Sequence, residues 1–117
     1  IITYGLGVHW ALDEINEREG VSAEIIDLRT LVPLDVESIY KAVEKTGKVI
    51  VLHEDCLAGG IGGEISALIN EHCFEYLDAP VIRVASLNSP VPFAESLEKI
   101  FLPQKRLTKA VDRILSY

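Results

Sequence analysis

The sequence predicts an α/β protein, a three-layer α/β/α sandwich built on a mainly parallel sheet of four to five strands. Short β-branched runs alternate with segments of helical periodicity along the whole chain. One run, KVIVL at 48–52, is apolar throughout, as expected of a central strand that is covered on both faces. Glycines and prolines fall between the segments, where turns are required. Because crossovers between parallel strands are right-handed, we expect helices on both faces.

The first half of the chain contains two predicted strands before the KVIVL run, and two predicted helices. Ile1–Tyr4 and Ala23–Asp27 read as the strands, and the apolar residues between them recur at helical spacing. Gly20 is the expected stop of the first helix, because glycine accepts the left-handed conformation at a helix end. Asp35 is expected to cap the second helix, which Gly47 ends.

The second half begins with a long predicted helix, which runs from Ile61 to Tyr76 and is stopped by Pro80. The fourth predicted strand is Val81–Ala85. A loop with two prolines then leads to a short helix, Glu95–Phe101. Pro103 is expected in the first turn of the last helix, because that turn has no need of its N–H.

Composition excludes several classes of function. The chain has 117 residues, of which 49% are hydrophobic and 25% charged, and a net charge of −7. A broad nucleic-acid surface needs clustered Lys and Arg, which this charge disfavours. No apolar run approaches the ~18 residues of a membrane span, and no signal peptide opens the chain. We expect a cytoplasmic domain, residues 1–117, with no nucleic-acid or membrane partner. Since the chain opens on a strand without a methionine, we expect a fragment of a longer protein.

The stretch HEDCLAGGIGGE, His53–Glu64, suggests three kinds of site. Glycines between a strand and a helix can hold an anion, but the dinucleotide pattern G-x-G-x-x-G breaks at Ile65. Four adjacent polar residues cannot close one metal site, since neighbours in an extended chain point to opposite sides. A thiolate pair of Cys56 with His53 is less favoured than a reduced, buried thiol. We therefore favour a tight turn that brings the helix close to the sheet, with a weakly bound anion as the alternative.

His53 and Glu54 stand at the carboxyl end of the third predicted strand. In open parallel sheets this edge is where ligands and partners meet the domain. The pair either satisfies backbone groups of the loop or contacts a neighbouring subunit or domain.

A basic stripe lies on the last predicted helix. Lys105, Lys109 and Arg113 recur every four residues, with Arg106 beside them. A solvated helix face is the favoured interpretation, since basic residues near a helix C-terminus also suit its dipole.

The string IDLRTLVPLD, Ile26–Asp35, resembles the I-D-L-R-T-x-x-P-x-D segment of the transketolase C-terminal domain family. Further matches keep the family's order: Lys45-Thr46-Gly47, His53-Glu54, Gly59–Ile65, Cys73-Phe74, Leu77–Pro80, Arg83-Val84 and Pro90–Pro92. The resemblance covers essentially the whole chain. It is closest to the β-subunit, or the β part of an α–β fusion, of thiamine-diphosphate-dependent 2-oxoacid dehydrogenases, with the branched-chain type favoured over pyruvate or acetoin.

The resemblance implies an assembly domain of the decarboxylase component. In such enzymes thiamine diphosphate and Mg²⁺ bind between other domains, so we expect no catalytic, cofactor-binding or metal-binding residue in this chain, and no activity of the chain alone. The expected partners are the other domains and subunits of the same component, in a homodimer or heterotetramer, and the dihydrolipoyl acyltransferase core of the multienzyme complex.

Two groups of residues carry these expected contacts. Contacts with a neighbouring subunit or domain are assigned to Asp27, Arg29, Thr30, His53, Glu54, Gly60, Gly62, Gly63 and Glu64. Docking of the acyltransferase core is assigned to Asp78 and to the carboxylate of Tyr117, because relatives hold a small basic domain with acidic groups near the end of the chain.

Two departures from the family are visible, and two alternatives stay open. Asn88 replaces a commoner Asp, which removes a charge, and the family's extra antiparallel edge strand does not precede Ile1. The first alternative is a regulatory module that binds an anion at Gly59–Gly63. The second is the C-terminal domain of a transketolase-like or deoxyxylulose-phosphate-synthase-like enzyme.

Overall fold

Four parallel strands form one sheet in the order β2-β1-β3-β4, which confirms the predicted α/β class in a computed structural model that describes residues 1–117. The strands are β1 (Ile2–Thr3), β2 (Ile26–Asp27), β3 (Ile50–Cys56) and β4 (Ile82–Ser86). Because the strands are parallel, all of them end at one edge of the sheet. We call it the carboxyl edge, and the opposite one the amino edge.

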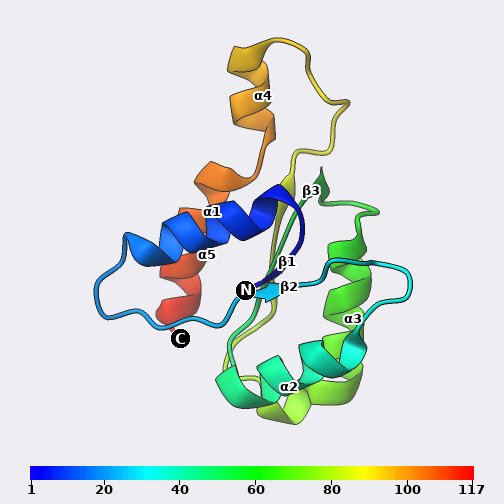
Figure 1. Cartoon of the computed structure of the whole chain (residues 1–117), viewed down its shortest axis with the longest axis vertical. Coiled ribbons are helices and arrows are strands. Elements are labelled where there is room, and N and C mark those ends of the chain that lie inside the picture. Colours follow the sequence, from blue (N-terminus) through cyan, green and yellow to red (C-terminus); the bar gives the residue numbers. More distant parts are fainter.

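Helices cover both faces of this sheet, as Figure 1 shows. On one face lie α1 (Leu6–Asn16) and α5 (Gln104–Leu115), and on the other lie α2 (Val36–Thr46) and α3 (Ile61–Cys73). A short helix, α4 (Glu95–Phe101), projects beyond the carboxyl edge. None of the helices combines the length and the apolar character that a membrane span requires.

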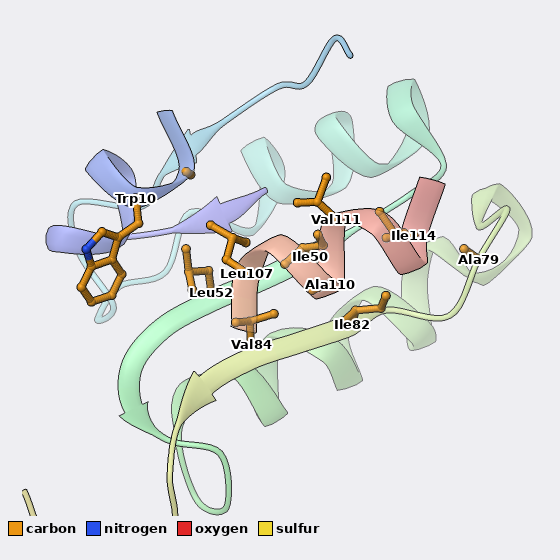
Figure 2. Packing of buried hydrophobic residues seen from close by; sticks show 11 residues of the cluster. Trp10, Ile50, Leu52, Ala79, Ile82, Val84, Leu107, Ala110, Val111 and Ile114 are labelled. Carbon is orange, nitrogen blue, oxygen red and sulfur yellow. The ribbon is translucent and has the colours of Figure 1, made fainter. Parts of the chain in front are cut away.

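The core is split by the sheet into two clusters of buried side chains. In the first, Leu107 and Ile114 of α5 pack with Leu52 and Val84 of the sheet (Figure 2). In the second, on the other face, Val51 packs with residues of α2 and α3. Successive residues of β3 thus enter opposite clusters, which is why the KVIVL run is apolar at every position after its lysine.

Local signals set the ends of α2 as predicted. The Asp35 carboxylate accepts the backbone N–H of Ser38 at 3.1 Å and its hydroxyl at 2.6 Å. These two hydrogen bonds, the hydroxyl's first, hold the pKa of Asp35 below its usual value. At the other end Gly47 adopts φ 66° and donates its N–H to the Val43 carbonyl at 2.9 Å. The helix therefore lies between its predicted cap and its predicted stop.

Several predicted boundaries are wrong. Strand β2 begins at Ile26, where Ala23 was expected. Helix α1 ends at Asn16, and Gly20 lies in the following turn at φ 75°. Arg18 lies in the segment between Asn16 and Gly20, and its side chain bonds Asp112 of α5 at 2.7 Å. Helix α3 ends at Cys73, and residues 74–76 form a separate 3₁₀ turn. Strand β3 continues to Cys56 through a shift of register against β4.

Candidate functional site at the carboxyl edge

The carboxyl edge gathers the ends of all four strands and most of the residues expected at an interface. Asp27 ends β2, Gly5 follows β1, and His53 and Glu54 lie in the last part of β3. Strand β1 lies between β2 and β3, so the chain connects from β1 to β2 on one side of β1 and then crosses to β3 on its other side. Such a switch point opens a crevice at the strand ends. Gly5 and Glu54 meet there, since a Cβ on Gly5 would lie 3.9 Å from the Glu54 carboxylate.

His53 points into the domain and supports the glycine turn that follows β3. Its side chain is only 1% exposed, and its Nε2 accepts the backbone N–H of Gly62 at 3.2 Å. The neutral ring therefore carries its proton on Nδ1. That nitrogen is buried and has no hydrogen-bond partner. Burial lowers the pKa of His53, while the Asp55 carboxylate acts in the opposite direction.

Gly60 and Gly62 are glycines because the imidazole occupies the space where their side chains would be. A Cβ on Gly60 or Gly62 would approach the His53 ring closer than 3.0 Å, and one on Gly60 would also meet the Cys56 carbonyl. Gly63 differs, because a Cβ there would meet only Arg83, at 3.6 Å. The turn is thus tight so that α3 can start directly above a buried histidine.

Asp27 holds a strained turn at the end of β2. Its carboxylate pairs with Arg29 Nε at 2.6 Å and accepts the Arg29 backbone N–H at 3.2 Å. Arg29 is the one non-glycine residue with positive φ, at 59°, and its side chain is 85% exposed. Thr30 adds a bond from its hydroxyl to the Pro33 carbonyl at 3.1 Å, beside a cis peptide between Val32 and Pro33. The left-handed backbone of the exposed Arg29 points to a functional position.

An open depression of about 590 Å³ separates this turn from the start of α1. Gly5, His9, Asp27 and Arg29 line it, together with Leu6 and Val8. The Leu6 side chain is 45% exposed here. The surface offers charged and apolar groups together but is too open to enclose a small molecule. It suits contact with another protein surface better than it suits a reaction.

The predicted residues on either side of the glycine turn are placed differently from His53. Glu54 and Glu64 are exposed, and Glu64 lies in the first turn of α3, where the helix dipole favours an acid. Burial raises the pKa of Tyr4 at the end of β1, and the negative charges of Asp55 and Glu54 raise it further. Glu54 is therefore the member of the His53-Glu54 pair that can reach a neighbour.

The chemical alternatives for this stretch find no support in its geometry. The Cys56 thiol donates to the Ser89 carbonyl at 3.7 Å, while His53 Nε2 is bonded to Gly62, so the two do not form a thiolate pair. The cysteines are free thiols. No three side chains among His, Cys, Asp and Glu are arranged to bind a metal ion. Gly62 and Gly63 donate to His53 and to the Gly60 carbonyl, so these amides do not face an anion.

Asp78 and Tyr117, the predicted docking residues, lie away from this edge, toward the amino edge. The backbone N–H of Asp78 donates to the Gly47 carbonyl at 2.8 Å, and its carboxylate packs against Gly47. Tyr117 follows α5 and is 56% exposed. Ala79 packs in the same cluster as Ile114 of α5, so the two docking residues come from segments that meet across the core.

Sequence reasoning missed two side chains that tie the loops of the carboxyl edge together. Arg83 donates to the Leu57 carbonyl at 3.2 Å, and the Asn88 side-chain oxygen accepts the N–H of Ala58 at 2.8 Å. An amide oxygen can accept this bond as an aspartate would, so the substitution at 88 keeps the bond while removing the charge. The available signal for Arg83 was a single charged residue inside the apolar run Val81–Ala85.

Comparisons with known proteins agree with this architecture. The family described as "Transketolase, C-terminal domain" matches residues 1–107. A solved structure described as "Split gene transketolase, inactive beta4 tetramer" superposes with a TM-score of 0.79 at 25% identity, over 98% of this chain and 37% of that one.

Curated relatives are named as subunits of 2-oxoacid dehydrogenases. "2-Oxoisovalerate dehydrogenase subunit beta" of Bacillus subtilis is 45% identical over 99% of this chain and 36% of the relative. "Pyruvate dehydrogenase E1 component subunit beta" of Rickettsia bellii is 41% identical over 90% of this chain and 33% of the relative. The chain thus spans about a third of the length of these relatives.

Proposed function

Because this chain belongs to the transketolase C-terminal domain family, we propose that it is the assembly domain of the β-subunit, or β part, of a thiamine-diphosphate-dependent 2-oxoacid dehydrogenase. It packs the subunits of the decarboxylase component around a cofactor that other domains bind. The names of its relatives support this assignment. No group of three His, Cys, Asp or Glu side chains is arranged to hold a metal ion. We assign thiamine diphosphate and Mg²⁺ to other domains of the parent enzyme, and we place no catalytic step on this chain.

The Asp27–Arg29 turn is the observation that carries the proposal. It holds an exposed guanidinium on a strained backbone at the carboxyl edge, next to an open depression. Arginine is favoured at interfaces because its planar group pairs with carboxylates in two directions. Thr30 follows Arg29 in the same turn, and Glu54 and Glu64 are exposed elsewhere along the carboxyl edge, whereas His53 is buried and holds the glycine turn. We propose that this edge meets a neighbouring subunit in a homodimer or heterotetramer.

Docking of the dihydrolipoyl acyltransferase core belongs to the opposite edge in this proposal. Asp78 is exposed there and would supply an acidic group that holds a small basic domain, and Tyr117 is exposed at the same edge. Because the two surfaces lie at opposite edges of the sheet, subunit packing and docking do not compete. A branched-chain substrate is favoured for the parent enzyme, in keeping with the 2-oxoisovalerate dehydrogenase relative. The cytoplasmic location stays a prediction.

A transketolase-like enzyme is the second candidate for the parent protein. The split-gene transketolase has the same fold over nearly the whole of this chain. In either parent the domain would serve assembly, so the experiment below tests the role of the domain and not the substrate.

Two measurements on the 117-residue chain test the proposed role. Isothermal titration with thiamine diphosphate and Mg²⁺ is expected to show no binding, and micromolar affinity would contradict an assembly role. Sedimentation velocity is expected to show self-association that weakens in Arg29→Glu. Lys41→Glu is the matched control, because Lys41 is exposed on α2, outside the carboxyl edge. A strict monomer at high concentration, or equal effects of both variants, would count against the carboxyl edge as the interface.

A further inference from the structure

A second charged surface lies away from both edges described above, along the free side of β4. A groove of about 340 Å³ runs between this strand and α5. Arg106, Lys109 and Arg113 of α5 line it, and no acidic residue does. The chain as a whole carries a net charge of −7. The groove is therefore positively charged, whereas the molecule as a whole is negatively charged.

The three cations that α5 contributes to this groove, which Arg83 of β4 also lines, are not neutralised by the domain itself. None of them takes part in an ion pair, whereas Arg18, Arg29, Lys45 and Lys99 all do. Arg106 donates instead to backbone carbonyls, to Ala85 at 2.8 and 3.2 Å, to Ile100 at 3.1 Å and to Phe101 at 2.7 Å. Its hydrogen bonds are satisfied but its positive charge is not compensated. Lys109 and Arg113 are exposed, and their side chains donate no hydrogen bond to the domain.

The backbone of β4 offers hydrogen-bonding groups to the same groove. The Ile82 N–H donates to Val49 and the Ser86 carbonyl accepts from Leu57, so both residues face β3. Along a strand the backbone N–H and C=O groups of successive residues point to alternate sides. The N–H and C=O of Arg83 and the N–H of Ala85 therefore point away from β3. Arg106 already occupies the Ala85 carbonyl. β4 is the last strand of the sheet, so the other three groups face outward without a partner strand.

We propose that this groove binds an acidic protein segment in an extended conformation, which adds to β4 as a further strand. Adding a strand to a free edge supplies backbone hydrogen bonds, and side chains at alternate positions supply specificity. Helix α5 runs along β4, as Figure 2 shows. Lys109 and Arg113 are separated by about 6 Å along the helix. Alternate residues of a strand are separated by about 6.6–6.8 Å. Acidic side chains at every second position of the segment can therefore face the two cations together.

A binding experiment with defined peptides tests this proposal on the 117-residue chain. The probe is the blocked peptide Ac-TEVEVEVT-NH₂, and its lysine counterpart Ac-TKVKVKVT-NH₂ is the control. We expect the acidic peptide to shift the NMR signals of β4 and α5, and to protect the Arg83 and Ala85 amides from hydrogen exchange. The lysine peptide is expected to do neither. Two further probes carry N-methyl groups, one on its glutamates and the other on its valines. The backbone N–H groups of glutamates and valines point to opposite edges of the added strand, and only one edge faces β4, so only one of the two modified peptides should lose binding.

Charge-matched variants separate the groove from a general electrostatic effect. The double variant Lys109→Gln/Arg113→Gln is expected to weaken binding of the acidic peptide by roughly tenfold, since it removes two cations at the contact. The double variant Lys41→Gln/Lys105→Gln changes the net charge equally at exposed residues outside the groove, and is expected to bind almost normally.

Several outcomes would overturn the proposal. One is the absence of binding at about 1 mM peptide, where a weak segment interaction is still detectable. Another is equal weakening in the two double variants. A third is competition by inorganic phosphate that shifts the same α5 signals, with no peptide protection of the Arg83 and Ala85 amides, which would identify a small-anion site. Tighter binding of a single-stranded oligonucleotide than of the acidic peptide would identify a nucleic-acid surface instead.

Discussion

The imidazole Nε2 of His53 accepts the backbone N–H of Gly62 across the start of α3, at 3.2 Å, from a position that is 1% exposed. This bond joins the central strand to the helix that follows it. It explains in one contact why a histidine, and not an aliphatic residue, continues the apolar run of β3. It also explains why the turn above it needs glycine.

Gly62→Ala is expected to destabilise the domain, because the new methyl group would enter the space of a buried ring. Overpacking of this kind costs about 1–3 kcal/mol. Gly63→Ala is the matched control one residue later, where a Cβ finds ordinary contact at 3.6 Å. Alanine there should stabilise the helix by up to about 1 kcal/mol. Urea unfolding measures both, and equal free energies of unfolding in the two variants would contradict this account of the turn.

The stability of the domain is expected to fall as pH decreases through the range in which His53 becomes protonated. Burial lowers the pKa of His53 in the folded state, so the unfolded chain binds the proton more readily. The contribution is complete above the unfolded pKa of about 6.5 and is lost as pH falls toward the folded pKa, with a slope of at most about 1.4 kcal/mol per pH unit. His53→Gln should remove this part of the profile. An unchanged profile in that variant would show that other groups cause the dependence.

Arg29→Gly is expected to separate the stability of the turn from its interface role. Glycine accepts the left-handed backbone that Arg29 adopts at φ 59°, so relief of strain should stabilise the domain by about 1 kcal/mol. The lost pair with Asp27 offsets little of this gain, because Arg29 is 85% exposed. Self-association should weaken at the same time, since the guanidinium is gone. Thermal unfolding and sedimentation measure the two effects, and a stable variant that associates normally would remove Arg29 from the interface.

Arg106→Lys is expected to destabilise the connection between α4 and α5. The guanidinium bonds three carbonyls at once, of Ala85, Ile100 and Phe101, which an ammonium group cannot reproduce. A loss of about 1–3 kcal/mol is expected for carbonyls left without a partner. Arg113→Lys is the control on the same helix, because Arg113 is exposed and donates no side-chain bond to the domain. Hydrogen exchange of the α4 amides should rise in the first variant only.

Much of the fold could be predicted because its signals are local. The Asp35 cap, the Gly47 stop and the apolar KVIVL run each act within a few residues, and the structure places all three as expected. Helix ends were less predictable. Helix α1 ends at Asn16, before the expected stop at Gly20, and Arg18 between them bonds Asp112, a residue 94 positions away in the chain.

The candidate site was predictable in its location but not in the orientation of its side chains. Parallel strands end at one edge, so Asp27, Glu54 and the glycine turn had to lie at the same side of the sheet. His53 lies on the same face as Val51, as alternation along β3 requires, but only the structure shows that the start of α3 covers this face at the strand end and buries the ring beneath Gly62.

By itself the sequence determined the class of fold, the absence of a dinucleotide pattern in the glycine turn and the polar character of the carboxyl edge, since these follow from spacing and residue type. Only the tertiary structure decided that His53 is buried, that Arg29 is held in a left-handed conformation, and that Arg106 turns toward β4 beside a basic groove. The physical reason is the range of the contacts. Arg106 meets Ala85 from 21 residues away, and such a pairing exists only after α5 has packed on the sheet.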